Sequence, residues 1–166
     1  MTLMIYTGLG PLDALTLPKA FFKDSAIATV RSKTGTPVYW RVIEPLKSIL
    51  DAAQAHEAMT LCANSRGRPW TVSGFRASWR KVRVELENKD QVQSGLTLYG
   101  LRHTVATILR EAGLDERTIA DALGQKTEAI VRHYSRTANL KRKMIGVGTV
   151  FESEVNNRRT RTVKPG

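Results

Sequence analysis

The sequence has one cysteine, few histidines and no long uninterrupted apolar run. Because Cys62 stands alone, an internal disulfide bond is impossible and a cysteine-rich zinc site cannot be built. The histidines His56, His103 and His133 lie too far apart for a recognisable metal-ligand spacing. Residues 1–17 are apolar but lack a basic start and are broken by glycine, proline and aspartate, so they predict neither a signal peptide nor a membrane span. These absences favour a cytoplasmic protein.

Acidic residues are also scarce. The chain carries 15 Asp and Glu against 26 Lys and Arg, which gives a formal net charge of +11 and an isoelectric point near 10.2. Such an excess favours polyanionic partners, with nucleic acid ahead of an anionic membrane. A basic protein without such a partner is the alternative. The 166 residues, 42% of them hydrophobic, suffice for one domain with a hydrophobic core.

The sequence patterns predict an α+β fold, mostly helical, with one small antiparallel sheet. Residues 1–17 predict a helix, a Gly-Leu-Gly-Pro corner and a second short helix. Two β-rich runs, residues 26–31 and 37–43, flank a turn that contains Gly35 and predict a hairpin. We expect residues 59–62 to add the third strand.

Apolar residues at helical spacing predict five further helices. They cover residues 44–55, 74–87, 101–113, 115–124 and 127–134. The helix at 74–87 has an apolar stripe, and its other faces are strongly basic. A charged face of this kind is either solvated or turned towards phosphates. We assign its basic side chains to DNA binding: Arg76, Arg80, Lys81 and Arg83.

The last segment, residues 141–166, has no helical or strand periodicity. It carries seven basic residues against two acidic ones. This composition predicts a partly disordered basic tail that follows a domain formed by residues 1–140.

Four motifs follow one another along the chain. They are YTGLG-x-x-DAL at residues 6–15, RSKTGTPV at 31–38, LYGLRHTVATILREAGL at 98–114, and LGQ at 123–125 with Tyr134 nine residues after Gln125. In order and spacing, they resemble the catalytic domain of the tyrosine recombinases, the phage-integrase family. The resemblance covers residues 5 to 137. It matches that family's Thr-Gly-Leu-Arg segment, lysine-bearing hairpin, His-x-x-Arg helix and Leu-Gly-His to tyrosine interval.

The resemblance implies a reaction that needs no cofactor. A tyrosine attacks a DNA phosphodiester and keeps the broken end as a phosphotyrosine. Two arginines bind the non-bridging oxygens, a lysine gives a proton to the departing 5′ oxygen, and histidines assist. Carried over to this sequence, Tyr134 matches the nucleophile, Arg102 the second arginine and Lys33 the hairpin lysine.

Three positions depart from the family pattern. Gly10 stands where the first arginine belongs, Tyr99 replaces the histidine of His-x-x-Arg, and Gln125 replaces the later histidine. Tyr99 and Gln125 still offer hydrogen bonds, whereas Gly10 offers no side chain. Loss of one oxyanion donor typically slows a reaction about 100- to 1,000-fold. We expect His103 to pack or cap within its helix, with replacement of the missing histidine as the alternative.

The sequence therefore predicts a protein of DNA integration and recombination that binds double-stranded DNA, with itself or another recombinase subunit as a second partner. Strand cleavage is expected to be weak or absent, and an active recombinase using Tyr134 is the alternative. A second alternative is an interaction module with no role on DNA. We expect the catalytic domain to be truncated at its N-terminus and to lack the helical core-binding domain of the family.

Overall fold

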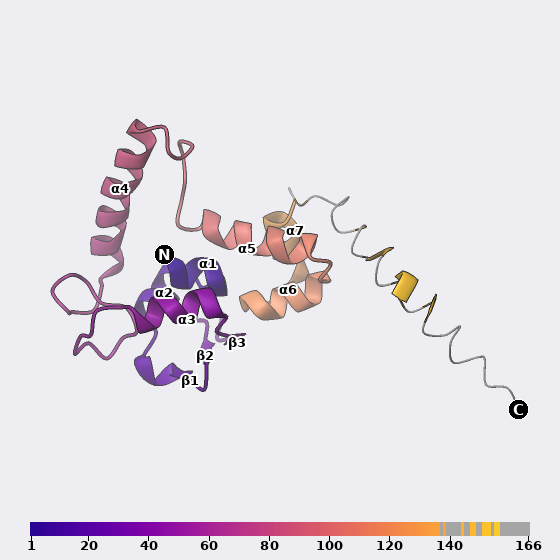
Figure 1. Cartoon of the computed structure of the whole chain (residues 1–166), viewed down its shortest axis with the longest axis horizontal. Helices are drawn as coiled ribbons and strands as arrows, with labels where there is room; N and C mark the ends of the chain where they lie inside the picture. Colours follow the sequence, from indigo (N-terminus) through magenta and orange to yellow (C-terminus); the bar gives the residue numbers. More distant parts are fainter. Residues whose placement is uncertain (137, 139–143, 145–146, 149–150, 154, 157–166) are drawn as a thin grey trace, which may run out of the picture.

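The computed structural model describes residues 1–136, 138, 144, 147–148, 151–153 and 155–156 (Figure 1). Its elements are α1 (Thr2–Thr7), α2 (Pro11–Thr16), η1 (Lys19–Phe21), β1 (Phe22–Lys23), β2 (Ala26–Val30), β3 (Pro37–Arg41), α3 (Glu44–Asp51), α4 (Val72–Asn88), α5 (Gly100–Glu111), α6 (Glu116–Leu123) and α7 (Glu128–Tyr134). The fold is mostly helical with one small sheet, as the sequence predicts. Most of the predicted basic tail, residues 141–166, lies outside the described residues.

The corner between α1 and α2 depends on one glycine in a left-handed conformation. Gly8 ends α1 at φ 62°, and its N–H donates to the Met4 carbonyl. Glycine takes this conformation at little cost because it has no Cβ. Two residues later the chain is extended at Gly10 (φ −71°), and Pro11 begins α2. A proline suits the first position of a helix because its fixed φ is already helical.

The sheet is antiparallel, in the order β1-β2-β3. The prediction that residues 59–62 form the third strand is wrong. Only Thr60 makes a bridge, with Pro18, and Leu61 N–H donates to Leu17, so this run pairs with the connection after α2. The third strand is β1, which a tight turn with positive φ at Asp24 and Ser25 folds back onto β2. Its two residues are too few to show a period in the sequence.

Helices α4 to α7 begin and end within two residues of their predicted limits, whereas α3 ends at Asp51 and not at residue 55. Thr71 caps α4 by accepting from Gly74 N–H at 3.1 Å, and Asp115 caps α6 by accepting from Thr118 N–H at 2.9 Å. Gly124 ends α6 at φ 62°. In each case a side-chain oxygen or a glycine satisfies backbone groups that the helix end leaves without partners. No helix in the described part of the chain is both long and apolar enough to cross a membrane.

The buried apolar side chains form two clusters. The first cluster joins α1, α2, α3 and the hairpin and contains Leu3, Met4, Leu9, Ala14, Leu15, Leu17, Ile27, Val38, Val42, Leu46 and Leu98. The second cluster joins α5, α6 and α7 and contains Val105, Ala106, Ile119, Ala120, Leu123 and Val131. Trp40 of β3 packs against both, and its Nε1 donates to the Ala122 carbonyl at 2.8 Å.

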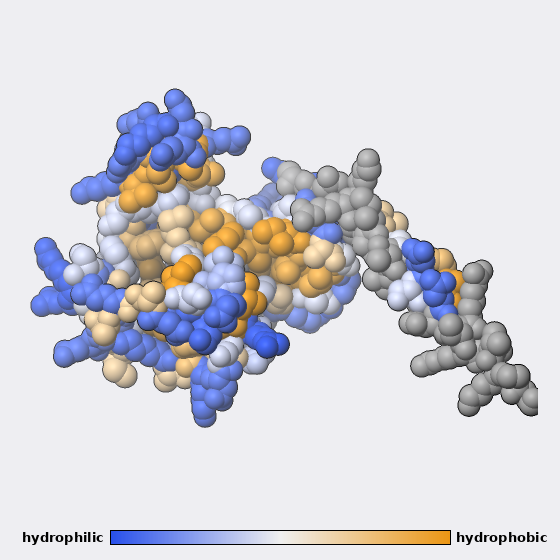
Figure 2. All heavy atoms as spheres, viewed as in Figure 1, coloured by the Kyte–Doolittle hydropathy of each residue, from blue (hydrophilic) through white to orange (hydrophobic). Residues whose placement is uncertain are grey.

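Helix α4 has no fully buried residue and projects away from the two clusters (Figure 1). Trp79 and Phe75 only pack against the edge of the first cluster. Hydrophilic side chains cover the outer end of α4 (Figure 2). The helix is therefore a charged extension of the domain rather than part of its core.

Candidate active site

Arg102 of α5 is buried, with only 3% of its surface exposed. Its Nη1 donates to the Gly8 carbonyl at 2.5 Å, and its Nη2 donates to the Leu123 carbonyl. These carbonyls belong to the C-terminal ends of α1 and α6, where the helix dipole favours a cation. With the Gln125 amide oxygen turned towards the guanidinium, that oxygen accepts from Nε at 2.9 Å. Gln125 therefore orients Arg102.

The surroundings of Arg102 disfavour the charged form of its guanidinium. Its pKa is lowered to about 10, first because the group is buried and second because the positive charge of Arg31 repels it. Interaction with the Tyr134 side chain acts in the opposite direction. Arg102 remains a cation at neutral pH, with the Tyr134 hydroxyl within its reach.

Tyr134, the predicted nucleophile, is the last residue of α7 and is half-buried. Its ring centre lies 5.9 Å from Cζ of Arg102 and 4.2 Å from the ring centre of His103, with the two rings tilted by 69°. His103 therefore packs on α7. The sequence instead predicts that it packs or caps within its own helix. Burial and the charge of His133 lower the pKa of His103, against a hydrogen bond to the Tyr134 backbone. Tyr134 thus lies between the buried cation of Arg102 and the imidazole of His103.

The space beside Gly10 is filled from another element. A Cβ built on Gly10 would lie 3.5 Å from Nη2 and 3.6 Å from Nη1 of Arg31. Arg31 follows β2, and its Nη1 lies 3.0 Å from Oδ2 of Asp13. The other carboxylate oxygen of Asp13 accepts from the N–H and hydroxyl of Ser32, at 2.9 and 2.6 Å. Asp13 therefore holds both the guanidinium beside Gly10 and the start of the hairpin turn.

Lys33 and Tyr99 lie at the edge of this cluster. Lys33 is exposed in the turn between β2 and β3, which contacts α6 where Thr34 Oγ1 donates to the Gly124 carbonyl at 3.4 Å. Tyr99 is 55% exposed at the start of α5, and its carbonyl accepts from the backbone N–H of Arg102. The structure thus brings Arg102, Gln125 and Tyr134 into contact and leaves the other two predicted residues open to solvent.

The four basic residues assigned to DNA binding on α4 are not equivalent. Arg76, Arg80 and Lys81 are exposed. Arg83 is half-buried: its Nε lies 3.5 Å from Glu87, and its Nη1 donates to the Leu96 carbonyl at 3.2 Å. Three of the four side chains can therefore meet a polyanion without first breaking a contact.

Sequence reasoning did not single out Arg31 or Asp13, although both lie within quoted motifs. Strand alternation could have found Arg31, because residues 27, 29 and 31 share the inward face of the hairpin. Ile27 is buried, and Arg31 keeps only 11% of its side-chain surface. An arginine on a buried face needs an acidic partner, which Asp13 provides.

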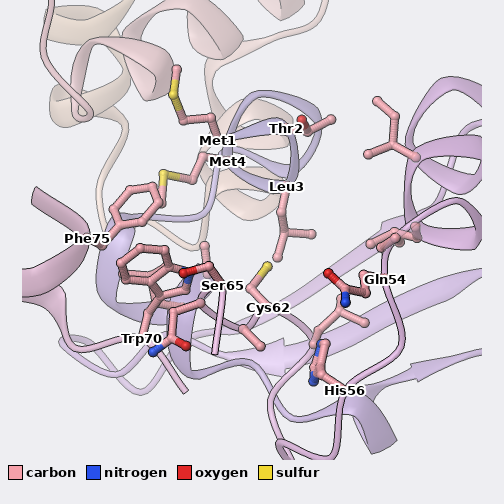
Figure 3. Close-up of a pocket in the computed structure, with 18 of the residues that line it drawn as sticks. Met1, Thr2, Leu3, Met4, Gln54, His56, Cys62, Ser65, Trp70 and Phe75 are labelled. Carbon is pink, nitrogen blue, oxygen red and sulfur yellow. The ribbon is translucent and has the colours of Figure 1, made fainter. Parts of the chain in front are cut away.

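A separate hollow of about 410 Å³ lies beside α1 and α3 (Figure 3). Leu3, Cys62, Trp70 and Phe75 line it, and none of the predicted site residues does. Burial raises the pKa of the Cys62 thiol. The hollow therefore lies beside the first cluster, with a mixed apolar and polar lining, apart from the site around Arg102.

Comparison with known proteins decides the family. The model described as "Phage integrase family" matches residues 3–141. The chain belongs to the phage integrase family. Among curated proteins, none matches the chain.

Solved structures with the same fold are recombinases and integrases. Residues of this phage-integrase chain superpose on a crystal structure of XerA recombinase with a TM-score of 0.69 and 20% identity, covering 99% of this chain and 57% of that one. The integrase of transposon Tn1549, in complex with a circular intermediate DNA, gives a TM-score of 0.69 and 15% identity, with 80% and 52% coverage. A lambda integrase dimer bound to a COC′ core site gives 0.64 and 20%, with 81% and 50% coverage. The chain thus spans about half the length of these structures.

Proposed function

We propose that this chain is a DNA-binding tyrosine recombinase of DNA integration and recombination, encoded by a mobile element and acting in the cytoplasm. It holds a backbone phosphate of duplex DNA beside Arg102 and Tyr134 and cleaves the strand slowly. One observation carries the proposal: α5 and α7 place the predicted nucleophile and a buried guanidinium side by side. The DNA complexes among the structural neighbours support the choice of substrate.

In the proposed reaction, the Tyr134 oxygen forms a bond to phosphorus and the bond to the 5′ oxygen breaks. The phenol of Tyr134 gives its proton to solvent water, and Lys33 in the exposed hairpin turn gives a proton to the departing 5′ oxygen and is reprotonated from water. Arg102 and the amide N–H groups of Gln125 donate to the non-bridging oxygens, where charge develops. Cleavage is slow because no histidine stands at residue 99 or residue 125, and Tyr99 is turned largely to solvent.

The exposed cations guide the duplex to this site. Arg76, Arg80 and Lys81 of α4 contact phosphates away from the cleaved one, and residues 141–166 act as a second basic region. Removing residues 141–166 should weaken DNA binding and leave the melting temperature unchanged. A large fall in melting temperature would refute the division at residue 140. A second recombinase subunit on the same DNA is the proposed protein partner.

The test uses binding and cleavage together. A labelled duplex followed by fluorescence anisotropy from about 50 to 200 mM salt should show affinity that falls steeply with salt. A pool of nicked duplexes with randomised sequence traps cleaved ends, so a covalent adduct appears as a shifted band on a denaturing gel. We expect a faint adduct that Tyr134→Phe abolishes while DNA binding is kept. Absence of binding at the lowest salt would refute the DNA function as a whole.

Binding without cleavage is the second candidate. The observation that favours it is the engagement of Arg102: Gly8, Leu123 and Gln125 accept from all three of its nitrogens. Fewer donors then remain for a phosphate. Salt-dependent binding with no Tyr134-dependent adduct would select this candidate over the first.

A further inference from the structure

We propose that Arg31 supplies the second phosphate-binding guanidinium of the site, in place of the arginine that Gly10 lacks. Asp13 orients it. This inference rests on the proposed function, and it identifies the second residue that meets the phosphate beside Arg102.

The first support is the location of the guanidinium. Both terminal nitrogens of Arg31 lie within 3.6 Å of the point where residue 10 would place a Cβ. A side chain at residue 10 would therefore begin in van der Waals contact with this guanidinium. Gly10 has an extended backbone with φ −71°, which any residue adopts, so its conformation does not require glycine. The absence of a side chain at residue 10 instead leaves room for Arg31.

The second support is how firmly the side chain is held. The stem of Arg31 crosses Gly124, where a Cβ would lie 2.5 Å from Arg31 Cγ. The next residue, Gln125, is the one that orients Arg102. At its far end, Arg31 meets Asp13 at 3.0 Å. The chain therefore fixes Arg31 at both ends and directs it to the corner that Arg102 also occupies.

The third support is the balance of charge and hydrogen bonds. Arg31 and Arg102 bring two positive charges, and among the described residues that interact with them only Asp13 brings a full negative charge. Nε and Nη1 of Arg31 are buried and donate no hydrogen bond of good geometry in the described structure, although Nη1 forms the ion pair with Asp13. Buried donors normally have partners, so this arrangement favours an added anion. One phosphodiester, with a single negative charge, restores the balance and provides acceptors.

A purely structural role is the competing interpretation. In that case Arg31 would only tie the hairpin to α2. Ser32 already makes this connection through two hydrogen bonds to Asp13. The two interpretations differ in what happens after DNA has bound: a structural arginine affects folding, whereas a phosphate ligand affects the covalent step.

The test compares Arg31→Gln with Arg41→Gln, which removes the same charge from an exposed position at the end of β3. Adduct formation is measured at saturating nicked duplex and DNA affinity by anisotropy. We expect Arg31→Gln to reduce the adduct about 100- to 1,000-fold. Arg41→Gln should leave it unchanged. Equal adduct yields from the two variants, with a Tyr134-dependent adduct in the unmodified chain, would overturn the role of Arg31 and leave the proposed function standing.

Two further measurements keep the test decisive. If the unmodified chain binds DNA without forming an adduct, cleavage fails as a function, and Arg31 is judged by its salt dependence. Arg31→Gln should then lower the slope of log affinity against log salt by about 0.9 more than Arg41→Gln does, and equal slopes would refute the proposal. If Arg31→Gln lowers the melting temperature, Arg31→Lys replaces it. Lysine keeps the charge beside Asp13 but lacks the planar guanidinium that binds two phosphate oxygens in a fixed geometry, so the adduct should fall at least about tenfold.

Discussion

The chain carries two groups of cations that differ in setting more than in chemistry. Arg31 and Arg102 are buried, and a carboxylate or backbone carbonyls hold them at fixed positions. Arg76, Arg80 and Lys81 on α4 are exposed and project with their helix away from the body of the domain (Figure 2). Charges in a desolvated corner act strongly on one nearby atom, whereas exposed charges act weakly and over a wide surface. Under the proposed function, the buried pair acts on the phosphate that reacts, and the exposed cations attract the duplex.

The largest effect should come from removing the buried cation. Arg102→Met leaves the Gly8 and Leu123 carbonyls and the Gln125 amide without their donor, so the free energy of unfolding should fall by about 3 kcal/mol or more. The adduct should disappear. Urea denaturation measures the first effect and the denaturing gel the second. Arg76→Met is the matched control on α4 and should change stability by less than about 0.5 kcal/mol. Equal losses for the two variants would contradict the comparison.

The next largest effect tests whether the corner at Gly10 holds one guanidinium. Gly10→Arg in the unmodified chain should add little cleavage, because Arg31 already fills the space. Gly10→Arg combined with Arg31→Ala should restore the adduct that Arg31→Ala alone removes. The yield of adduct should rise about 100-fold over that of Arg31→Ala alone, which is the lower end of the usual effect of one oxyanion donor. An additive result, with Gly10→Arg equally effective in both backgrounds, would show that the two positions are independent.

The exposed group should affect capture alone. The triple change Arg76→Gln, Arg80→Gln and Lys81→Gln should lower the salt slope of DNA binding by about 2.7, which is 0.9 per phosphate contact. At saturating DNA the adduct yield should stay the same. Arg83→Gln is the control, because Arg83 is engaged with Glu87 and Leu96 and should change the slope little. A triple variant with an unchanged slope would remove α4 from the DNA interface.

The smallest effect concerns His103. Because its pKa is lowered in the folded protein, the folded state binds this proton less tightly than the unfolded state does. No stability is lost while both states are neutral, and stability falls as pH drops below about 6.5, the ordinary histidine value. His103→Asn should flatten the fall in melting temperature between about pH 7 and 5. His133→Asn removes only the neighbouring charge and should flatten it less. Identical profiles for all three proteins would contradict the assignment.

The sequence predicted those parts of the molecule that depend on local periodicity. The helices from α3 to α7 repeat apolar residues at helical spacing, and their caps at Thr71 and Asp115 are local signals. The third strand was assigned wrongly because residues 59–62 are apolar for another reason, namely packing beside the connection after α2. A strand of two residues, such as β1, carries no period from which to predict it.

The same limit applies to the site. Motif spacing selected Arg102, Gln125 and Tyr134, which the structure places together. It gave no replacement for the arginine missing at residue 10. A motif compares positions along the chain, so it cannot show that the side chain of Arg31 lies beside Gly10 in the fold. The contact between Arg31 and Asp13 exists only after the hairpin has folded onto α2.

Trp40 gives the site one further property. The arginine beside Gly10 is mounted on the first cluster, Arg102 and Tyr134 are mounted on the second, and Trp40 is the side chain that packs against both. The proposed phosphate ligands therefore come from both clusters, which meet where α1 contacts α5 and where β3 contacts α6. A shift of about 1 Å between these elements would slow the proposed reaction on the order of 100-fold. Under the proposed function, heating should therefore reduce cleavage before it unfolds either cluster.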